Sequence, residues 1–514
     1  MPHDGRMTSR ATPLVAILGF VALGNVIGCA SRQTPEVRIV HDAAAALGGA
    51  DAIRAIRTMT IEGAGEVFAL GQNRTLDGPL LQWHITGYRR AIDFEHGRWR
   101  DELTQTAAFV TGWPDPTPVV AGYADDVAFD VDGGEASRLD AITARDRRAE
   151  LYHHPIGFLR AALATGASLD RARTEGDQDA VDLVVAGGER FTLYVDRHSH
   201  EPQRIVSKSH VAPLGDVTVS TAVSGYIEAA SSASAGSLRV KVPTRLTTRI
   251  GDTIVKDVQL TKVLVNPPAN ELRDLQAPRD ARAAPASRPA RVTVEDVAPG
   301  IWYVAGEGHH SVVVEFADHL TLIEAPVDDQ RTLAVIAQAR ALRPGKPLTQ
   351  VINTHHHFDH AGGIRAAIAE GLTIITHESN RQFYQGLATR ASTVAPDALA
   401  RNPRPLAIDT VSDTKVLTDG ARRLEIYPVT DSPHCAAMLM VYFPNEKLLV
   451  EADAYQPPPL AGPPPRTHPF AANLLDNIRR RRLRVDRILP IHGRIVPFGE
   501  LVAAARTSAP TRAN

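Results

Sequence analysis

A dense group of side chains able to bind a metal occupies residues 354–363, which read THHHFDHAGG. Four potential ligands fall within six residues, just after an apolar run: His355, His357, Asp359 and His360. In an extended segment, alternation places His355, His357 and Asp359 on one face. Clustered imidazoles are costly when left unpaired, and they are good ligands for borderline cations such as zinc. The pattern therefore predicts a metal site rather than a polar loop.

Three further ligand candidates follow downstream, each beside a predicted strand. These are His434 before Met438–Phe443, Asp453 after Lys447–Val450, and His492 after Arg487–Ile491. Together with the cluster they give seven candidate ligands from distant parts of the chain.

The order THxHxDHxGG, then His, Asp and His, resembles that of the metallo-β-lactamase superfamily, which includes glyoxalase II-type hydroxyacylglutathione hydrolases and lactonases. The resemblance covers about Val292–Gly499 and implies an α/β fold, an αββα sandwich with the metals at the open edge between two sheets. It also implies two Zn²⁺ ions, with iron or manganese as alternatives. By this resemblance the first ion is held by His355, His357 and His434, the second by Asp359, His360 and His492, and Asp453 bridges both.

The resemblance further implies a hydroxide between the metals as the nucleophile. Two zinc ions bring four positive charges, while Asp359, Asp453 and the hydroxide bring three negative ones, and the surplus can stabilise an oxyanion. Zinc also lowers the pKa of bound water to about 7. Asp359 has a second expected task as a catalytic residue, orienting the hydroxide and carrying its proton to the leaving group.

Two departures from the family pattern bear on the range of reactions that the protein could catalyse. Antibiotic-hydrolysing members of one subclass have a cysteine where Asp453 stands, so Asp453 favours an ester, thioester, lactone or phosphodiester substrate. The usual glycine before it is Ala452, preceded by Glu451. Glu451 either orders a ligand imidazole or is an ordinary capped acid. The leading hypothesis is a zinc-dependent hydrolase acting on a small molecule.

Three alternatives stay open at this point. One is an iron-dependent oxidoreductase of the sulfur dioxygenase type, which uses a related ligand set. Another is β-lactam hydrolysis. The third is a carrier that binds a lipid or lipoprotein in its first domain and has a regulatory metal domain.

Residues near the predicted metals are candidates for substrate contact. His309 and His310 precede a strand that should end near the site, and His310 is the candidate we retain. Tyr455 lies two residues after Asp453, and Asn473 follows a Pro-rich stretch that could form the rim. His377 is expected to be structural.

The N-terminus resembles a bacterial lipoprotein signal. The apolar run Pro13–Gly28 follows Arg6 and Arg10 and ends at Cys29, the expected lipidation site, although an ordinary signal peptide or membrane anchor is the alternative. Ala30 favours sorting to the outer membrane. We expect residues 1–28 to be removed and the protein to reside in the cell envelope, attached to the membrane by its lipid and facing the periplasm. Cys435 would then be left alone, buried and inert.

A mainly antiparallel β domain is predicted over residues 36–276 after short helices over Glu36–Ile56. Its strand-like runs are Met59–Leu70, Leu80–Phe94, Val181–Val185, Phe191–Val195, Gln203–Ser209, Val217–Tyr226, Leu238–Ile250 and Thr253–Val265. A helical insert is expected over Arg147–Thr165, and four histidines are expected at the surface or in turns: His153, His154, His198 and His200. The pattern resembles carrier domains that handle outer-membrane lipoproteins.

A linker rich in Pro, Ala and Arg occupies residues 277–291, and the metallo-β-lactamase-like domain is expected over residues 292–505. The chain has 514 residues and a net charge of -2. Its balanced charge provides no basic field for nucleic acid, so no nucleic-acid partner is expected.

Overall fold

The structure of the protein is a computed structural model. It describes residues 33–109, 115–231, 238–272, 274–285, 290–306, 308–458 and 470–507. The predicted signal segment and Cys29 lie outside these residues. Within the described ranges, no helix combines the length and the apolar character that a membrane crossing requires.

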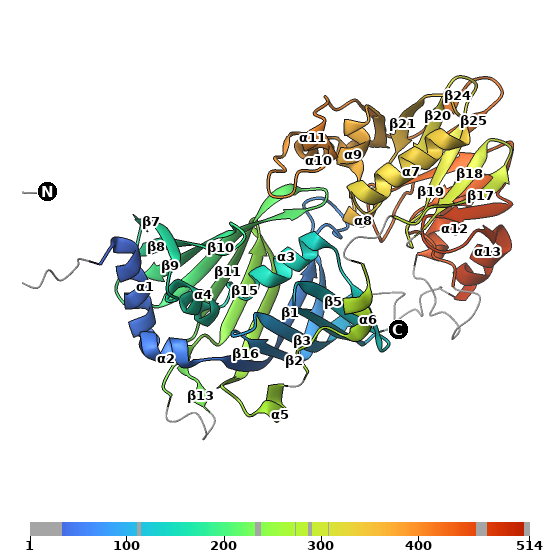
Figure 1. The fold of residues 1–514 in the computed structure, drawn as a ribbon. Helices are drawn as coiled ribbons and strands as arrows, with labels where there is room; N and C mark the ends of the chain where they lie inside the picture. Colours follow the sequence, from blue (N-terminus) through green and yellow to red (C-terminus); the bar gives the residue numbers. More distant parts are fainter. Residues whose placement is uncertain are drawn as a thin grey trace, which may run out of the picture.

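A large antiparallel sheet organises the first half of the chain, as predicted (Figure 1). Its strands run in the order β6-β5-β4-β3-β2-β1-β16-β15-β11-β10-β9-β8-β7, and short β13 (Ala230–Ser231) pairs parallel to β16. The bounds are β1 Thr58–Ala69, β2 Leu81–Asp93, β3 Arg98–Ala107, β4 Thr117–Ala124, β5 Val127–Asp132, β6 Glu135–Arg138, β7 Ser168–Glu175, β8 Gln178–Val184, β9 Arg190–Asp196, β10 Pro202–Val211, β11 Gly215–Ser224, β15 Arg245–Ile250 and β16 Thr253–Val265. A separate pair is formed by β12 (Ile227–Glu228) and β14 (Lys241–Val242).

Strands β3 to β7 were not predicted. In β3, β5, β6 and β7, charged residues obscure the alternation of a half-buried strand. In β3, Asp101 faces inward and is only 5% exposed. The adjacent strand neutralises it, since Arg90 Nη2 lies 2.8 Å from its Oδ2 atom. A buried ion pair thus replaces an apolar side chain at this position.

Four helices pack on this sheet: α1 (Pro35–Ala46), α2 (Ala50–Ala55), α3 (Ala141–Ala149) and α4 (Pro155–Ala162). The predicted helical insert is therefore two helices. The backbone N–H of Thr143 donates to the side chain of Asp140 and caps α3 at 2.8 Å, and Pro155 occupies the first turn of α4. Proline is tolerated at a helix start but not in its interior, so the chain breaks here.

Two of the four histidines expected at the surface are buried, which corrects the prediction. His153 and His154 are 7% and 5% exposed. His153 Nε2 lies 2.8 Å from the hydroxyl of Ser207, and His154 Nδ1 accepts from the N–H of Ile156 at 3.3 Å. Each ring therefore has one hydrogen-bond partner, on β10 for His153 and on α4 for His154, while its other nitrogen has none among the described residues. His198 and His200 lie in the β9–β10 turn, as expected.

The predicted linker contains packed structure. Beyond α5 (Ala269–Leu272), helix α6 (Arg279–Ala283) buries Ala281, and the preceding Ala277 is 1% exposed. Both alanines belong to a small core with Phe129. The connection therefore rests on the first domain over part of its length.

The second half is a mixture of helices and two sheets. Strands β17 to β23 form one sheet in chain order, and β24 to β29 form the other. Their bounds are β17 Thr293–Ala298, β18 Ile301–Ala305, β19 Ser311–Glu315, β20 Leu320–Ile323, β21 Leu348–Ile352, β22 Thr373–His377, β23 Ile408–Val411, β24 Lys415–Thr418, β25 Arg423–Pro428, β26 Leu439–Phe443, β27 Leu448–Glu451, β28 Arg487–Pro490 and β29 Val496–Pro497. The α/β class is as expected.

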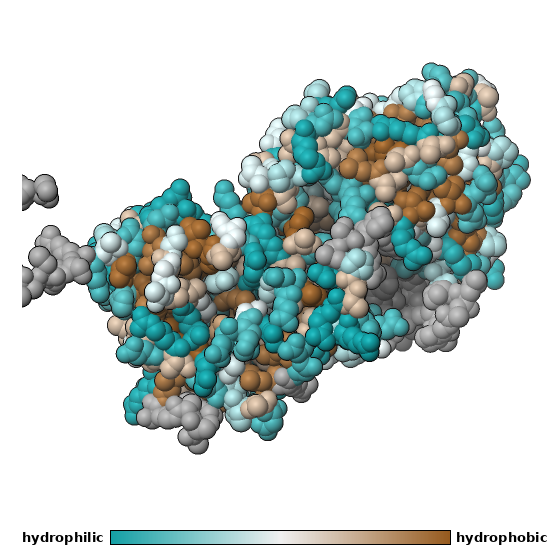
Figure 2. Space-filling model, viewed as in Figure 1, coloured by the Kyte–Doolittle hydropathy of each residue, from teal (hydrophilic) through white to brown (hydrophobic). Residues whose placement is uncertain are grey.

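Helices accompany both sheets, and Figure 1 shows α7 beside the first sheet and α12 and α13 beside the second. Their bounds are α7 Asp329–Leu342, α8 Phe358–Ala361, α9 Ile364–Ala369, α10 Arg381–Thr389, α11 Ala398–Arg401, α12 Ala471–Arg480, α13 Phe498–Thr507 and the 3-10 turn η2 Glu378–Asn380. On the face shown in Figure 2, hydrophilic residues predominate and hydrophobic residues gather in separate groups on each domain.

Candidate metal centre

The seven predicted ligands lie in segments that leave the ends of strands. After β21 the chain continues extended through His355 and His357, and α8 then presents Asp359 and His360. The other three side chains come from the second sheet: His434 precedes β26, Asp453 follows β27, and His492 follows β28. Two sheets therefore contribute to one site.

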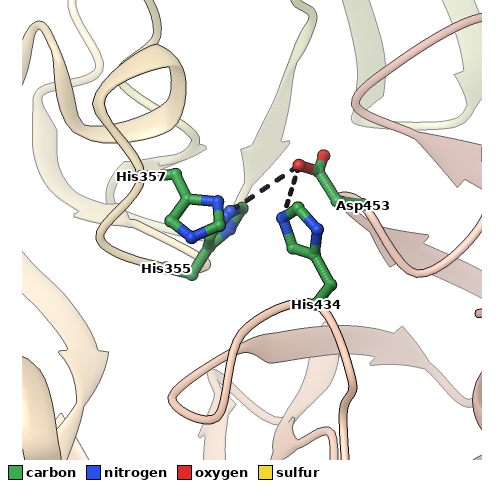
Figure 3. Close-up of side chains that lie close together, drawn as sticks. All are labelled: His355, His357, His434 and Asp453. Atoms are coloured by element: carbon green, nitrogen blue, oxygen red, sulfur yellow. Dashed lines mark ion pairs between the residues drawn. The ribbon is translucent and has the colours of Figure 1, made fainter. Parts of the chain in front are cut away.

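The first group of ligand atoms belongs to His355, His357, His434 and Asp453, which approach one another within 4.8 Å (Figure 3). His434 Nε2 lies 2.8 Å from Asp453 Oδ2, and His355 Nε2 lies 3.8 Å from the same oxygen. Three imidazoles and a carboxylate at such distances match the coordination that zinc favours.

The second group comprises Asp359, His360, Asp453 and His492, again within 4.8 Å. His360 Nε2 and His492 Nε2 each lie 3.0 Å from Asp453 Oδ1. Asp453 therefore presents one oxygen to each group, as the bridging position requires. The structure brings together all seven predicted ligands.

Unpaired nitrogen atoms indicate that the site is built for a cation. His355 Nε2 and His357 Nδ1 are buried and make no hydrogen bond within the described residues. Leaving a buried polar atom without a partner costs about 1–3 kcal/mol. A metal ion would satisfy these atoms, so the residues fit the predicted group.

The environment of the first group keeps His355 and His357 in the neutral form, which can bind a cation. Burial lowers the pKa of His355 well below its usual value and that of His357 to about 3. Both imidazoles are therefore neutral near pH 7, the form that binds metals. For His360, burial lowers the pKa, but the carboxylates of Asp453, Asp359 and Glu324 outweigh burial and raise it well above its usual value.

Glu324, which the sequence analysis did not single out, contacts the ring nitrogen of His360 that does not face Asp453. Its Oε2 atom lies 2.6 Å from His360 Nδ1, and its Oε1 atom accepts from the backbone N–H of Thr354 at 2.6 Å. Such a contact fixes the ring so that Nε2 faces Asp453 and the second ligand group. In sequence Glu324 reads as the end of a strand, so only the fold reveals its role.

Glu451 occupies a different place. It is fully buried, and its Oε2 atom accepts from the backbone N–H of Tyr455 at 2.9 Å. Burial raises the pKa of Glu451 well above its usual value. Of the two roles considered, the structure gives it that of a capping acid in the turn after β27.

The three residues predicted to contact the substrate, His310, Tyr455 and Asn473, are each packed against or hydrogen-bonded to other parts of the protein. His310 Nδ1 accepts from Gly306 N–H at 3.2 Å, and its ring packs on Tyr303. Tyr455 is 2% exposed and belongs to the hydrophobic core. Asn473 Nδ2 donates to the carbonyls of Thr430 and Asp431 at 3.0 and 3.1 Å, so it supports the segment before His434.

The neighbour of His310 reaches the centre instead. His309 Nε2 lies 3.2 Å from Asp359 Oδ2, and Gln72 Nε2 donates to Asp359 Oδ1 at 2.7 Å. Gln72 comes from the first domain, and no sequence motif marks it. Both oxygens of Asp359 are thus held by side chains outside the predicted ligand set.

The two remaining predictions concern residues near the ligands. Burial raises the pKa of the Cys435 thiol to about 12, as expected for an inert cysteine. Its Sγ atom lies 3.5 Å from His356 Nδ1. His377 Nδ1 accepts from the N–H of Ser379 at 3.2 Å and so caps η2, a structural role as predicted.

The residues that form this site lie within a region that matches a known protein family. Residues 304–492 match the family model described as the Metallo-beta-lactamase superfamily. Among solved structures, the chain is similar to a metallo-beta-lactamase from Pontibacter korlensis, with 17% identity over 42% of this chain and 99% of that chain and a TM-score of 0.33. It is also similar to the mono-zinc form of FIM-1 from Pseudomonas aeruginosa, with 19% identity, 43% and 97% coverage and a TM-score of 0.33. No curated protein matches the chain.

Proposed function

We propose, from the premise that residues 304–492 form a metallo-β-lactamase superfamily domain of a metal-dependent hydrolase, that the protein uses zinc to cleave an ester, thioester, lactone or related bond. The observation that carries the proposal is the position of Asp453, whose two oxygens face the two ligand groups. The superfamily match supports the reaction class, and the bridging carboxylate favours this substrate range over β-lactams.

Each ligand group would hold one cation, with Asp453 shared. When bound, the metals would supply Lewis-acid activation of water and of the scissile carbonyl. Asp359 would take the proton of the attacking water and pass it to the leaving group. Its carboxylate is suited to this task because Gln72 and His309 fix its orientation.

An αββα arrangement is part of the same proposal. One core cluster contains residues of both sheets, such as Val312 and Leu439, together with Leu474 of α12. A second cluster joins the other face of the first sheet to helices, through Val313 of β19 and Val335 of α7. Apolar contacts on both faces of the first sheet support this order of layers.

The test is a substrate panel with the chelated and the zinc-restored full-length protein. We expect chelation to abolish turnover and zinc to restore it on at least one ester, thioester, lactone or phosphodiester. His434→Ala should remove the activity, whereas the matched control His198→Ala, in an exposed turn, should retain it. A zinc-loaded protein that is inert on the whole panel contradicts the proposal.

Two other outcomes would favour the alternatives. Iron in the natively purified protein together with oxygen consumption would favour the sulfur dioxygenase alternative, and turnover of lactams alone would favour the β-lactamase alternative.

The location in the cell envelope is also proposed. Lipidation of Cys29 would attach the protein to the outer membrane, facing the periplasm. Metabolic labelling with an alkyne fatty acid should mark the wild type and leave Cys29→Ser unlabelled. Equal labelling of both proteins would contradict the anchor.

A cavity in the first domain favours a second candidate function, the binding of an amphipathic ligand. The cavity measures about 530 Å³ and lies between the sheet and the α3–α4 segment. Apolar side chains such as Phe68, Leu103 and Leu246 line it, and Arg90 and Asp101 pair within it. This volume suits a small amphipathic molecule.

This second function is tested by ligand binding. A fluorescent long-chain fatty acid should bind the wild type, and Leu103→Trp should weaken binding at least tenfold by filling the cavity. Val416→Trp, at an exposed position of the other domain, is the control. Equal binding by all three proteins would contradict a role for the cavity.

A further inference from the structure

The loop between β1 and β2, residues 70–80, reaches the metal centre from the first domain. Three consecutive residues contact three different parts of the centre. Gln72 Nε2 donates to Asp359 Oδ1 at 2.7 Å, and the carbonyl of Asn73 lies 3.0 Å from His357 Nε2. Arg74 contacts the segment around His434: its Nε donates to the carbonyl of Ser432 at 3.1 Å, and its carbonyl accepts from the N–H of Ala436 at 2.9 Å.

The contact with Asn73 determines the tautomer of His357. A carbonyl oxygen only accepts, so His357 Nε2 must carry the hydrogen. In the neutral ring, Nδ1 then has the free electron pair. His357 Nδ1 is buried and makes no hydrogen bond within the described residues, and His357 belongs to the first ligand group. The β1–β2 loop therefore presents the metal-binding nitrogen of His357.

The loop is held in shape by its own contacts. Asn73 Nδ2 donates to the carbonyls of Thr75 and Leu76 at 2.5 and 2.8 Å. Gly71 has a φ of +76°, and a Cβ atom there would lie 2.3 Å from the ring of Phe358. Only glycine allows this close approach to the residue that precedes Asp359.

We infer that the β1–β2 loop is an integral part of the metal centre, in which Gln72 positions Asp359 and the Asn73 carbonyl orients His357. The first domain is then more than an anchor or a specificity module. The inference rests on the metal site of the proposed function, but not on the substrate or reaction.

The experiment measures metal binding by the full-length protein. Gln72→Met keeps the length of the side chain and removes the donor, whereas Asp77→Asn alters an exposed residue of the same loop as the control. Zinc affinity is measured by chelator competition, and Co²⁺ spectra report the ligand geometry. We expect Gln72→Met to weaken the Asp359 site about tenfold and to change its Co²⁺ bands, as loss of an outer-shell contact does.

A second variant displaces the loop. Gly71→Ala should weaken both sites and change both sets of bands, because the added Cβ pushes against Phe358. Circular dichroism monitors folding, and Gln72→Met decides the question if Gly71→Ala does not fold. Affinities and spectra like those of Asp77→Asn in the folded variants would overturn the inference. Metal binding that depends on the loop in a protein without hydrolytic activity would contradict only the proposed function.

Discussion

The carboxylate of Glu324 lies 2.6 Å from Nδ1 of His360, and both side chains are fully buried. Because the carboxylate accepts at Nδ1, the other ring nitrogen of His360 is turned toward Asp453 and the second ligand group. A residue at the end of β20 thereby fixes a ligand carried by α8.

Replacing this carboxylate should weaken the second metal site. Glu324→Gln keeps the shape and removes the charge, so we expect metal affinity at the His360 site to fall about tenfold or more. Chelator competition measures the change. Glu315→Gln, at a surface ion pair with Lys346, is the control. If both variants bind metal as the wild type does, the role assigned to Glu324 is wrong.

Loss of the Asp359 carboxylate should mainly affect the chemical step. We expect Asp359→Asn to lower kcat by about 10²–10⁴-fold, the range typical of a lost acid–base group, with a smaller change in KM. Steady-state kinetics at saturating zinc measure both values, with Asp318→Asn at an exposed site as the control. An undiminished kcat would exclude Asp359 as the proton carrier.

Metal removal should destabilise the folded protein. The buried imidazoles and carboxylates of the two groups satisfy one another only in part, and a bound cation stabilises the native state by mass action. At free zinc about 100-fold above the dissociation constant, the gain is about 2.7 kcal/mol per site. Denaturant unfolding with and without chelator tests this. Coincident transitions would contradict the expectation.

Acid should weaken the first domain through His153. Burial lowers the pKa of His153 from 6.5 to about 4. Between these values the unfolded chain binds more protons, so the free energy of unfolding decreases as the pH falls through this range. From neutral pH to about pH 5, the loss from this residue is about 2 kcal/mol. His153→Gln should flatten the pH dependence, while His198→Gln should leave it unchanged. An identical slope in both variants would show that His153 does not cause it.

The candidate ligands that the structure brings together could be picked out from the sequence because their types and order are distinctive. His355 to His360 form a local pattern, and His434, Asp453 and His492 each lie beside a recognisable strand. Residues that act on the ligands have no such pattern. Gln72 lies 287 residues before Asp359, and Glu324 ends an ordinary strand, so only tertiary structure relates them to the site.

Burial was harder to predict than chemistry. His153 and His154 resemble turn residues in sequence, yet Ser207 and the start of α4 pair with them inside the first domain. Strand β3 was missed for a related reason, since the inward-facing Asp101 is paired with Arg90 of the next strand. In both cases a hydrogen-bond or ion-pair partner that only the folded structure supplies makes a polar residue acceptable in the interior.

Docking of the two domains has a consequence for protein engineering. Besides the β1–β2 loop, the start of β11 also reaches the second domain, where Asp216 accepts from the N–H groups of Thr393 and Val394. The second domain therefore cannot be transferred to another protein as an independent unit. A chimera that joins it to an unrelated first domain would keep the seven candidate ligands but lose the contacts that position them.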